Sequence, residues 1–197
     1  MEKANSSRED SEWSTLDRNI LAIVFDKLDI MDITMGASRD LMFVAERMPN
    51  IEKLALPVSL SLYNEIRVLG RNCSNLNNLK LMGYLENYDT VQIVRYLQSL
   101  KRLSLQCSEV YVEDVISLIR GLGNLTILNL THCRYLSNSY ITRNHIVQAA
   151  THQKLEKLIM CSRNNCRVCQ KERPRLFGWN TYFEKYWRND EIKELEF

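Results

Sequence analysis

Apolar positions along the chain recur in one short pattern at nearly constant spacing. In each copy an apolar residue is followed by others at +3 and +5: NIEKLAL (50–56), NLNNLKL (75–81), SLKRLSL (99–105), NLTILNL (124–130) and KLEKLIM (154–160). The first apolar residues of these copies are separated by 25, 24, 25 and 30 positions. Because side chains alternate along a strand, the +3 and +5 residues point to one side. Each segment is therefore predicted to be a short strand that buries one face.

Between these segments the apolar spacing changes to three and four, which is typical of amphipathic helices. The helical pattern covers 63–73, 90–100, 112–123 and 137–152. Asp89 and Asp114 lie near the expected helix starts, and Gly70, Gly121 and Gly123 near the expected ends, as capping chemistry favours. A strand and a helix in each period of about 25 residues is the leucine-rich-repeat pattern. We predict an α/β fold, a leucine-rich-repeat solenoid with parallel strands on the concave side and helices on the convex side.

Residues that alternate with the buried leucines are expected to form the concave face. The candidate substrate-binding residues on this face are Lys53, Asn78, Lys80, Arg102, Ser104, Asn129 and Lys157. Repeat proteins bind partner proteins through such extended surfaces. The alternative is that these residues are simply solvated strand positions, and the sequence leaves both interpretations open.

A different pattern precedes the repeats. In EWSTLDRNILAIVFDKLDIMDITMGAS (12–38), Asp17 suits a helix N-cap and is followed by a helical apolar stripe: Ile20, Leu21, Val24, Phe25 and Leu28. Asp32 suits the start of a second short helix at 33–37. Helices this short are not stable alone, so the stripe is expected to pack on the repeats or on another chain.

The stretch WSTLDRNILAIVFDKLDIMDITMGAS resembles the opening of an F-box, and an F-box followed by leucine-rich repeats resembles the plant F-box/LRR-repeat proteins. The resemblance covers 12–39 for the F-box and about 41–197 for the remainder. It implies a non-catalytic substrate-recognition subunit of an SCF-type cullin ubiquitin ligase, without a cofactor. In that family the F-box docks on a Skp-type adaptor and the repeats hold a protein substrate. By position, the adaptor-binding pattern falls on Leu16, Ile20, Leu21, Val24, Phe25, Leu28 and Ile33.

The F-box pattern is incomplete. After Gly-Ala-Ser (36–38) the family continues into a third helix with a Val-Cys-x-x-Trp pattern, a linker and an early repeat. Here Arg39 is followed directly by DLMFVAERMPNIEKLAL (40–56), which resembles a repeat already under way. The join has the appearance of an internal deletion. The alternative function is a leucine-rich-repeat interaction module that cannot join the ligase because its F-box is incomplete.

Cysteines raise the question of a metal site. The polar start of the chain lacks a secretory signal and no apolar run reaches membrane-spanning length, so we expect reduced thiols in the cytoplasm and/or nucleus. The segment CSRNNCRVCQKER (161–173) has the spacing Cys-x4-Cys-x2-Cys. Zinc requires four ligands, and Cys161, Cys166 and Cys169 supply three. The fourth would be His132, Cys133 or His152. A reduced basic loop is the favoured interpretation, with a zinc site or a redox role as alternatives.

Charge and the C-terminal tail complete the domain organisation. The net charge of +2 is spread through the chain, so neither nucleic acid nor membrane is an expected partner. The tail 175–197 is rich in aromatic residues, and Tyr182, Phe183, Tyr186 and Trp187 recur at helical spacing, which suits a helix that covers the C-terminal end of the array. We therefore divide the chain into a disordered N-terminus (1–11), a partial F-box (12–39), about five leucine-rich repeats (40–169) and a capping tail (170–197).

Overall fold

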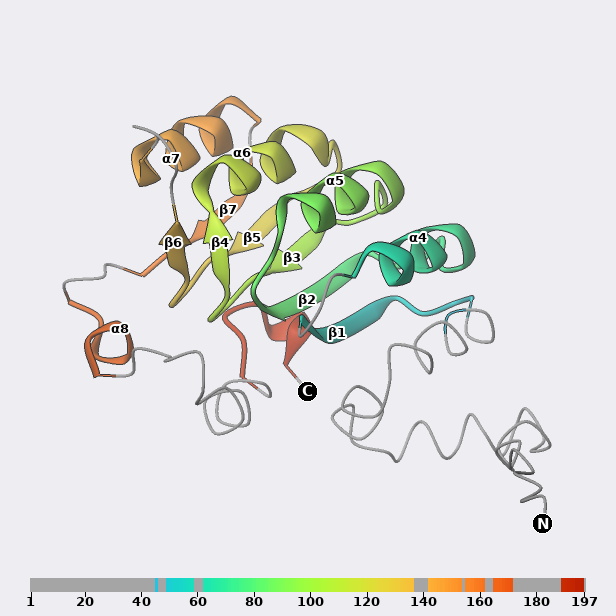
Figure 1. Cartoon of the computed structure of the whole chain (residues 1–197), viewed down its shortest axis with the longest axis horizontal. Helices are drawn as coiled ribbons and strands as arrows, with labels where there is room; N and C mark the ends of the chain where they lie inside the picture. Colours follow the sequence, from blue (N-terminus) through green and yellow to red (C-terminus); the bar gives the residue numbers. More distant parts are fainter. Residues whose placement is uncertain are drawn as a thin grey trace, which may run out of the picture.

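The computed structural model describes residues 45, 49–58, 62–136, 142–153, 155–161, 165–171 and 189–196. Strands and helices alternate along these residues in a mixed α/β arrangement (Figure 1). In chain order the elements are β1 (Lys53–Val58), α4 (Tyr63–Asn72), β2 (Asn78–Gly83), α5 (Asn87–Tyr96), β3 (Arg102–Ser104), β4 (Glu109–Tyr111), α6 (Val112–Gly121), β5 (Ile127–Asn129), β6 (Arg134–Leu136), α7 (Arg143–His152), β7 (Lys157–Ile159), α8 (Arg167–Lys171) and the 3-10 helix η2 (Lys193–Leu195).

The main sheet is parallel and has five strands in the order β1-β2-β3-β5-β7. Each strand lies within one copy of the repeated apolar pattern or overlaps it, so the predicted strands are confirmed. A second sheet pairs β4 with β6 in parallel, and the sequence pattern did not predict it. Together these features make an α/β fold like that of leucine-rich repeats.

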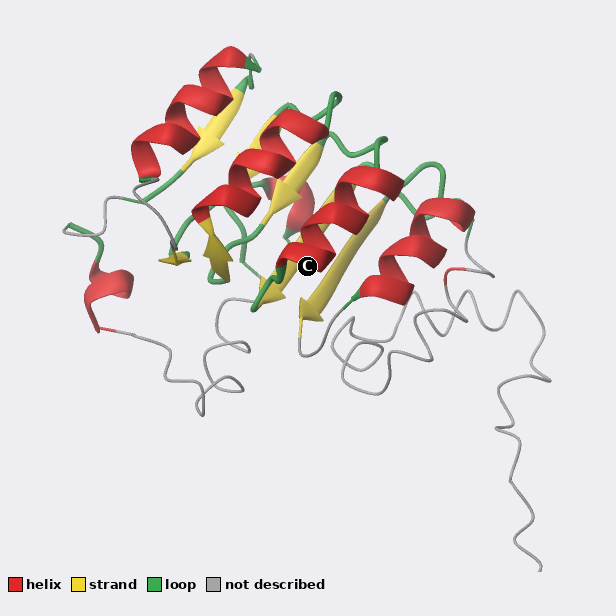
Figure 2. Ribbon diagram, turned by 45° about the horizontal axis from the view of Figure 1, so that its top comes forward, coloured by secondary structure: helices red, strands yellow, loops and turns green. Residues whose placement is uncertain are grey.

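Helices α4, α5, α6 and α7 lie side by side along one face of the main sheet (Figure 2). The leucines at +3 and +5 point toward these helices and are buried: Leu54, Leu56, Leu79, Leu81, Leu103, Leu105, Leu128 and Leu130. They pack with apolar helix residues such as Ile66, Ile93 and Ile119 in one core. Ala45 belongs to the same core, and its carbonyl accepts a hydrogen bond from the Cys73 thiol at 3.6 Å. None of the described helices is long and apolar enough to cross a membrane.

Buried acids at the helix starts join neighbouring units. Asp89 and Glu86 form a capping box at the start of α5, and Asp89 Oδ1 also accepts the backbone N–H of Leu62, just before α4, at 2.8 Å. Asp114 Oδ1 accepts the side-chain amide of Asn87 at 2.6 Å. Both aspartates lie in the first turn of their helices as predicted, but only Asp89 takes part in a capping box, whereas Asp114 joins α6 to Asn87 of α5. The capping box also explains why α5 begins at Asn87, earlier than the sequence pattern indicated.

Gly70 lies inside α4 rather than beyond its end. A Cβ atom at this position would be 2.4 Å from the carbonyl oxygen of Tyr96 at the end of α5. Glycine is required here because the two helices approach closely, and not because the helix needs a terminating residue.

Candidate binding face and metal centre

The face of the main sheet opposite the helices, here called the helix-free face, contains the residues predicted to bind the substrate. Strand register aligns Lys53, Asn78, Arg102, Ile127 and Lys157 in one column, and Ala55, Lys80, Ser104, Asn129 and Ile159 in the next. The alignment of both columns follows the sequence prediction. The predicted residues differ, however, in how far their side chains are exposed to solvent. Lys53 and Lys157 are exposed, Arg102 is half-buried, and Asn78, Lys80, Ser104 and Asn129 are buried.

Residues 189–196, here called the C-terminal segment, cover the middle of the helix-free face. Helix η2 contacts β1 and β2, and Figure 1 shows the red end of the chain beside these strands. Ile192 and Leu195 are buried in this contact. This part of the tail therefore lies across early strands of the sheet. The helix predicted from the aromatic residues of the tail falls within 172–188, outside the described residues.

The Asp190 side chain holds the C-terminal segment against the helix-free face. Its Oδ2 lies 3.2 Å from Lys80 Nζ and accepts a hydrogen bond from Ser104 Oγ at 2.5 Å. Its Oδ1 accepts the side-chain amide of Asn129 at 2.8 Å and the backbone N–H of Ile192 at 2.8 Å. Three of the predicted face residues therefore converge on one carboxylate that belongs to the same chain.

The surroundings orient these donors toward Asp190. Asn129 Oδ1 accepts both the backbone N–H and the hydroxyl of Thr131, which turns its amide nitrogen toward the carboxylate. Lys80 Nζ also donates to the backbone carbonyl of Asn189 at 2.9 Å. At the edge of the segment, Arg102 lies 3.3 Å from Glu194 in a solvent-accessible ion pair.

Burial sets the electrostatics of the Lys80–Asp190 pair. Both side chains have 0% exposure. Burial lowers the pKa of the Lys80 ammonium, and the nearby Asp190 carboxylate opposes that shift. A buried lysine needs a partner of opposite charge. The sequence interpretation placed Lys80 on the binding face and did not connect it with the acids near the chain end.

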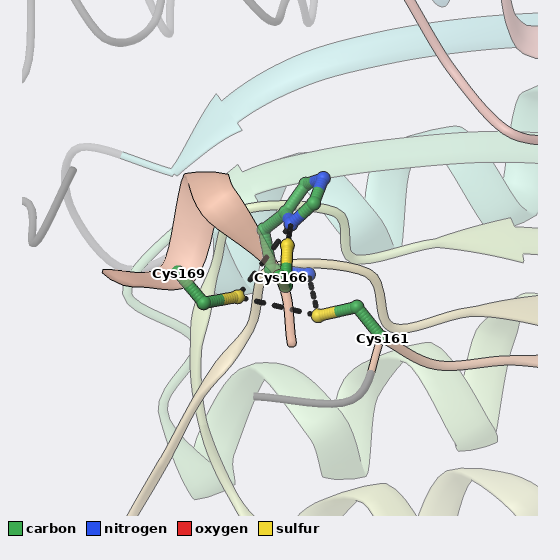
Figure 3. A group of neighbouring side chains, drawn as sticks. Cys161, Cys166 and Cys169 are labelled. Carbon is green, nitrogen blue, oxygen red and sulfur yellow. Dashed lines mark hydrogen bonds between the residues drawn. The ribbon is translucent and has the colours of Figure 1, made fainter. Parts of the chain in front are cut away.

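A second group of polar side chains lies at the β7 edge of the main sheet. The ligand atoms of His132, Cys161, Cys166 and Cys169 all lie within 4.8 Å of one another, and all four residues are half-buried. Figure 3 shows the three cysteine sulfurs directed toward a common point. His132 follows β5, Cys161 follows β7, and the other two cysteines lie at or in α8.

Of the three histidine and cysteine candidates for a fourth ligand, the structure brings only His132 to the cysteines. The Cys133 thiol is buried and donates to the carbonyl of Leu105 at 2.9 Å. His152 is exposed at the end of α7 and is not a member of the group. All six cysteines are described, and none forms a disulfide.

The thiols in this group differ in their acidity. Backbone N–H donation from Cys169 lowers the pKa of the Cys166 thiol. Burial raises the pKa of the Cys169 thiol to about 12. Cys166 is therefore the thiol of the two that ionises more readily.

The predicted adaptor-binding residues, at 16–33, lie outside the described residues. The structure therefore leaves the adaptor-binding assignment as a prediction.

Comparison with known proteins shows similarity to two plant proteins. One, from Arabidopsis thaliana and named as an F-box protein, is 43% identical over 190 residues, which cover 80% of this chain and 56% of the relative. The other, an F-box/LRR-repeat protein from the same plant, is 26% identical over 158 residues, covering 74% of this chain and 51% of the relative. The chain thus spans about half the length of both relatives. No protein-family model matches it.

Proposed function

This chain is a homologue of plant F-box proteins, and on that premise we propose that it is a substrate-recognition subunit of an SCF-type cullin ubiquitin ligase. Its N-terminal region docks on a Skp-type adaptor, and its repeats hold a protein target. The subunit is non-catalytic and acts in the cytoplasm and/or nucleus. The observation on which the proposal depends is the 43% identity to an F-box protein, together with the repeated strand–helix units.

The repeats are inferred to form a leucine-rich-repeat solenoid. Three observations support this: in-register parallel strands, one helix between successive strands on a single face, and buried leucines that continue from strand to strand. Each unit then contacts only its neighbours, so the array is an extended scaffold with one long free surface.

The protein target is proposed to bind on the helix-free face around the C-terminal segment. The Asp190 carboxylate already pairs with Lys80 and accepts hydrogen bonds from Ser104 and Asn129, so these three side chains hold the C-terminal segment. The accessible groups are Lys53 and Lys157 on the outer strands, together with exposed charged residues of the segment such as Glu191, Lys193 and Glu196. A target would meet a surface of mixed charge.

An incomplete F-box supports the alternative function, an interaction module that cannot enter the ligase. The F-box pattern stops after Arg39, and the sequence continues directly into a segment that resembles a repeat. Loss of the third F-box helix would remove part of the surface that supports adaptor docking.

A binding experiment with a purified Skp-type adaptor separates the two functions. We expect the chain to retain the adaptor at micromolar concentration, and Leu21→Asp with Phe25→Asp to abolish retention because both changes place charge in the predicted apolar stripe. Lys157→Ala, an exposed position on β7, is the matched control and should bind as wild type does. Absence of binding by the folded wild-type chain would refute the ligase function and leave the interaction module.

A further inference from the structure

We propose that His132, Cys161, Cys166 and Cys169 form a structural zinc site that fastens α8 to the terminal strand of the main sheet. The inference does not depend on the ligase function, because it uses only side chains at one edge of the fold. The sequence spacing left the fourth ligand open among three residues. The tertiary structure selects His132, which lies 29 positions before the first cysteine.

The distances match those between ligands in a tetrahedral zinc site. Zinc holds sulfur at about 2.3 Å and nitrogen at about 2.0 Å, which places neighbouring ligand atoms about 3.5–3.8 Å apart. In the structure Cys161 Sγ lies 3.3 Å from Cys169 Sγ, and Cys166 Sγ lies 3.3 Å from His132 Nδ1. Cys169 Sγ lies 3.6 Å from the same nitrogen. These three ligand pairs are thus within a few tenths of an ångström of the tetrahedral spacing, and all the ligand atoms lie within 4.8 Å of one another.

Backbone donors around the sulfurs favour thiolates. The backbone N–H of His132 donates to Cys161 Sγ at 3.2 Å. Such N–H groups stabilise the negative charge that sulfur acquires when it binds a metal. Arg143 adds a positive charge nearby, since its Nη2 donates to the carbonyl oxygen of Cys161 at 2.8 Å.

The donor set identifies both the metal and its role. Three thiolates and one imidazole are soft ligands that suit zinc in tetrahedral geometry, whereas calcium and magnesium require oxygen ligands. Four protein ligands fill the coordination sphere and leave no open position for water or substrate, so the site is structural rather than catalytic. Each of the three thiols releases its proton to solvent as the metal binds.

The position of the site explains what the metal would do. Among the described strands β7 is the last in the main sheet and pairs only with β5. His132 comes from the turn after β5, Cys161 from the end of β7, and Cys166 and Cys169 from α8. Helix α8 has five residues, too few to be stable alone. A metal bound by all three segments would hold this helix and close the exposed end of the array.

Metal analysis of the full-length protein tests the proposal. Protein purified under reducing conditions without chelators should contain close to one zinc ion per chain by elemental mass spectrometry. His132→Ala and Cys166→Ser should each lose most of that zinc. His152→Ala is the matched control, because it removes an exposed histidine of α7 outside the group, and should retain the full zinc content.

Cobalt binding by the wild-type protein keeps the test decisive if a variant fails to fold. Metal-depleted wild-type protein, shown by circular dichroism to be folded, should take up one Co²⁺ with the intense absorption bands of tetrahedral thiolate coordination, and excess Zn²⁺ should displace it. Near-zero zinc content together with no such cobalt spectrum would overturn the proposal.

Discussion

Replacement of Asp190 by alanine should release the C-terminal segment from the helix-free face. The substitution removes the carboxylate that pairs with the Lys80 ammonium. The same carboxylate accepts hydrogen bonds from Ser104, Asn129 and the backbone N–H of Ile192. Removing one member of a buried ion pair costs about 3–5 kcal/mol, because the remaining charge stays buried without compensation. Two uncharged side-chain donors lose their acceptor as well, at about 1–3 kcal/mol each if water is excluded.

The remaining contacts of the segment are too weak to hold it in place. Burial of Ile192 and Leu195 contributes about 1.5–3 kcal/mol for each side chain. The accessible Arg102–Glu194 pair adds at most about 1 kcal/mol, and the hydrogen bond from Lys80 to the Asn189 carbonyl oxygen about 1.5–3 kcal/mol. Ordering the backbone of residues 189–196 costs about 1–2 kcal/mol per residue, on the order of 10 kcal/mol in total. The segment should therefore detach, and water should then hydrate Lys80.

Hydrogen exchange and lysine labelling measure this release. In Asp190→Ala the amides of Ile192 and Leu195 should lose their protection, while those of β2 should remain protected because the leucine core is unchanged. Lys80 should become reactive toward an acylating reagent in the folded protein. Glu191→Ala, a change at an exposed neighbouring acid, should alter neither observable.

Two results would contradict a local release of the C-terminal segment. If Asp190→Ala keeps full amide protection in the C-terminal segment and Lys80 stays unreactive, the buried ion pair does not hold the segment. Global unfolding of the variant, seen as loss of protection throughout β2, would also contradict a local release.

Two further predictions concern the sheet and its edge. Gly83 has φ of +149°, and a Cβ atom there would lie 2.3 Å from the Val58 carbonyl oxygen, so Gly83→Ala should lower the free energy of unfolding by about 1–3 kcal/mol in urea denaturation. Gly123→Ala is the control, because nothing lies within 4 Å of a Cβ atom at that position. Equal effects of the two substitutions would contradict the steric argument. Burial raises the pKa of the Tyr135 hydroxyl, which donates a hydrogen bond to the carbonyl oxygen of Leu130. The neutral phenol therefore stabilises the fold below about pH 10, and this contribution is lost as pH rises above the pKa of tyrosine in the unfolded chain. The free-energy difference between wild type and Tyr135→Phe should therefore shrink above about pH 10, and a constant difference would refute this.

Local pattern was sufficient for the repeating part of the fold. Leucines at +3 and +5, such as Leu79 and Leu81, indicate one buried face of a strand, and the period near 25 residues places the strands in parallel. Asp89 and Asp114 marked helix starts because an acid near a helix N-terminus satisfies unpaired N–H groups. Strands β4 and β6 were missed because they lie outside the repeated apolar pattern that marks the strands of the main sheet. Their pairing depends on the neighbouring unit rather than on local sequence.

The two candidate sites depended on contacts between residues far apart in the chain. The sequence placed Lys80, Ser104 and Asn129 on one face, but Asp190 meets Ser104 across 86 positions, and no periodic pattern predicts that contact. The three cysteines were visible as a spacing, whereas the choice of His132 over Cys133 and His152 required the turn after β5 to lie against α8. Periodicity reports which side of an element is buried. Which distant segment covers that side, and which side chains meet there, is decided only when the chain folds back on itself.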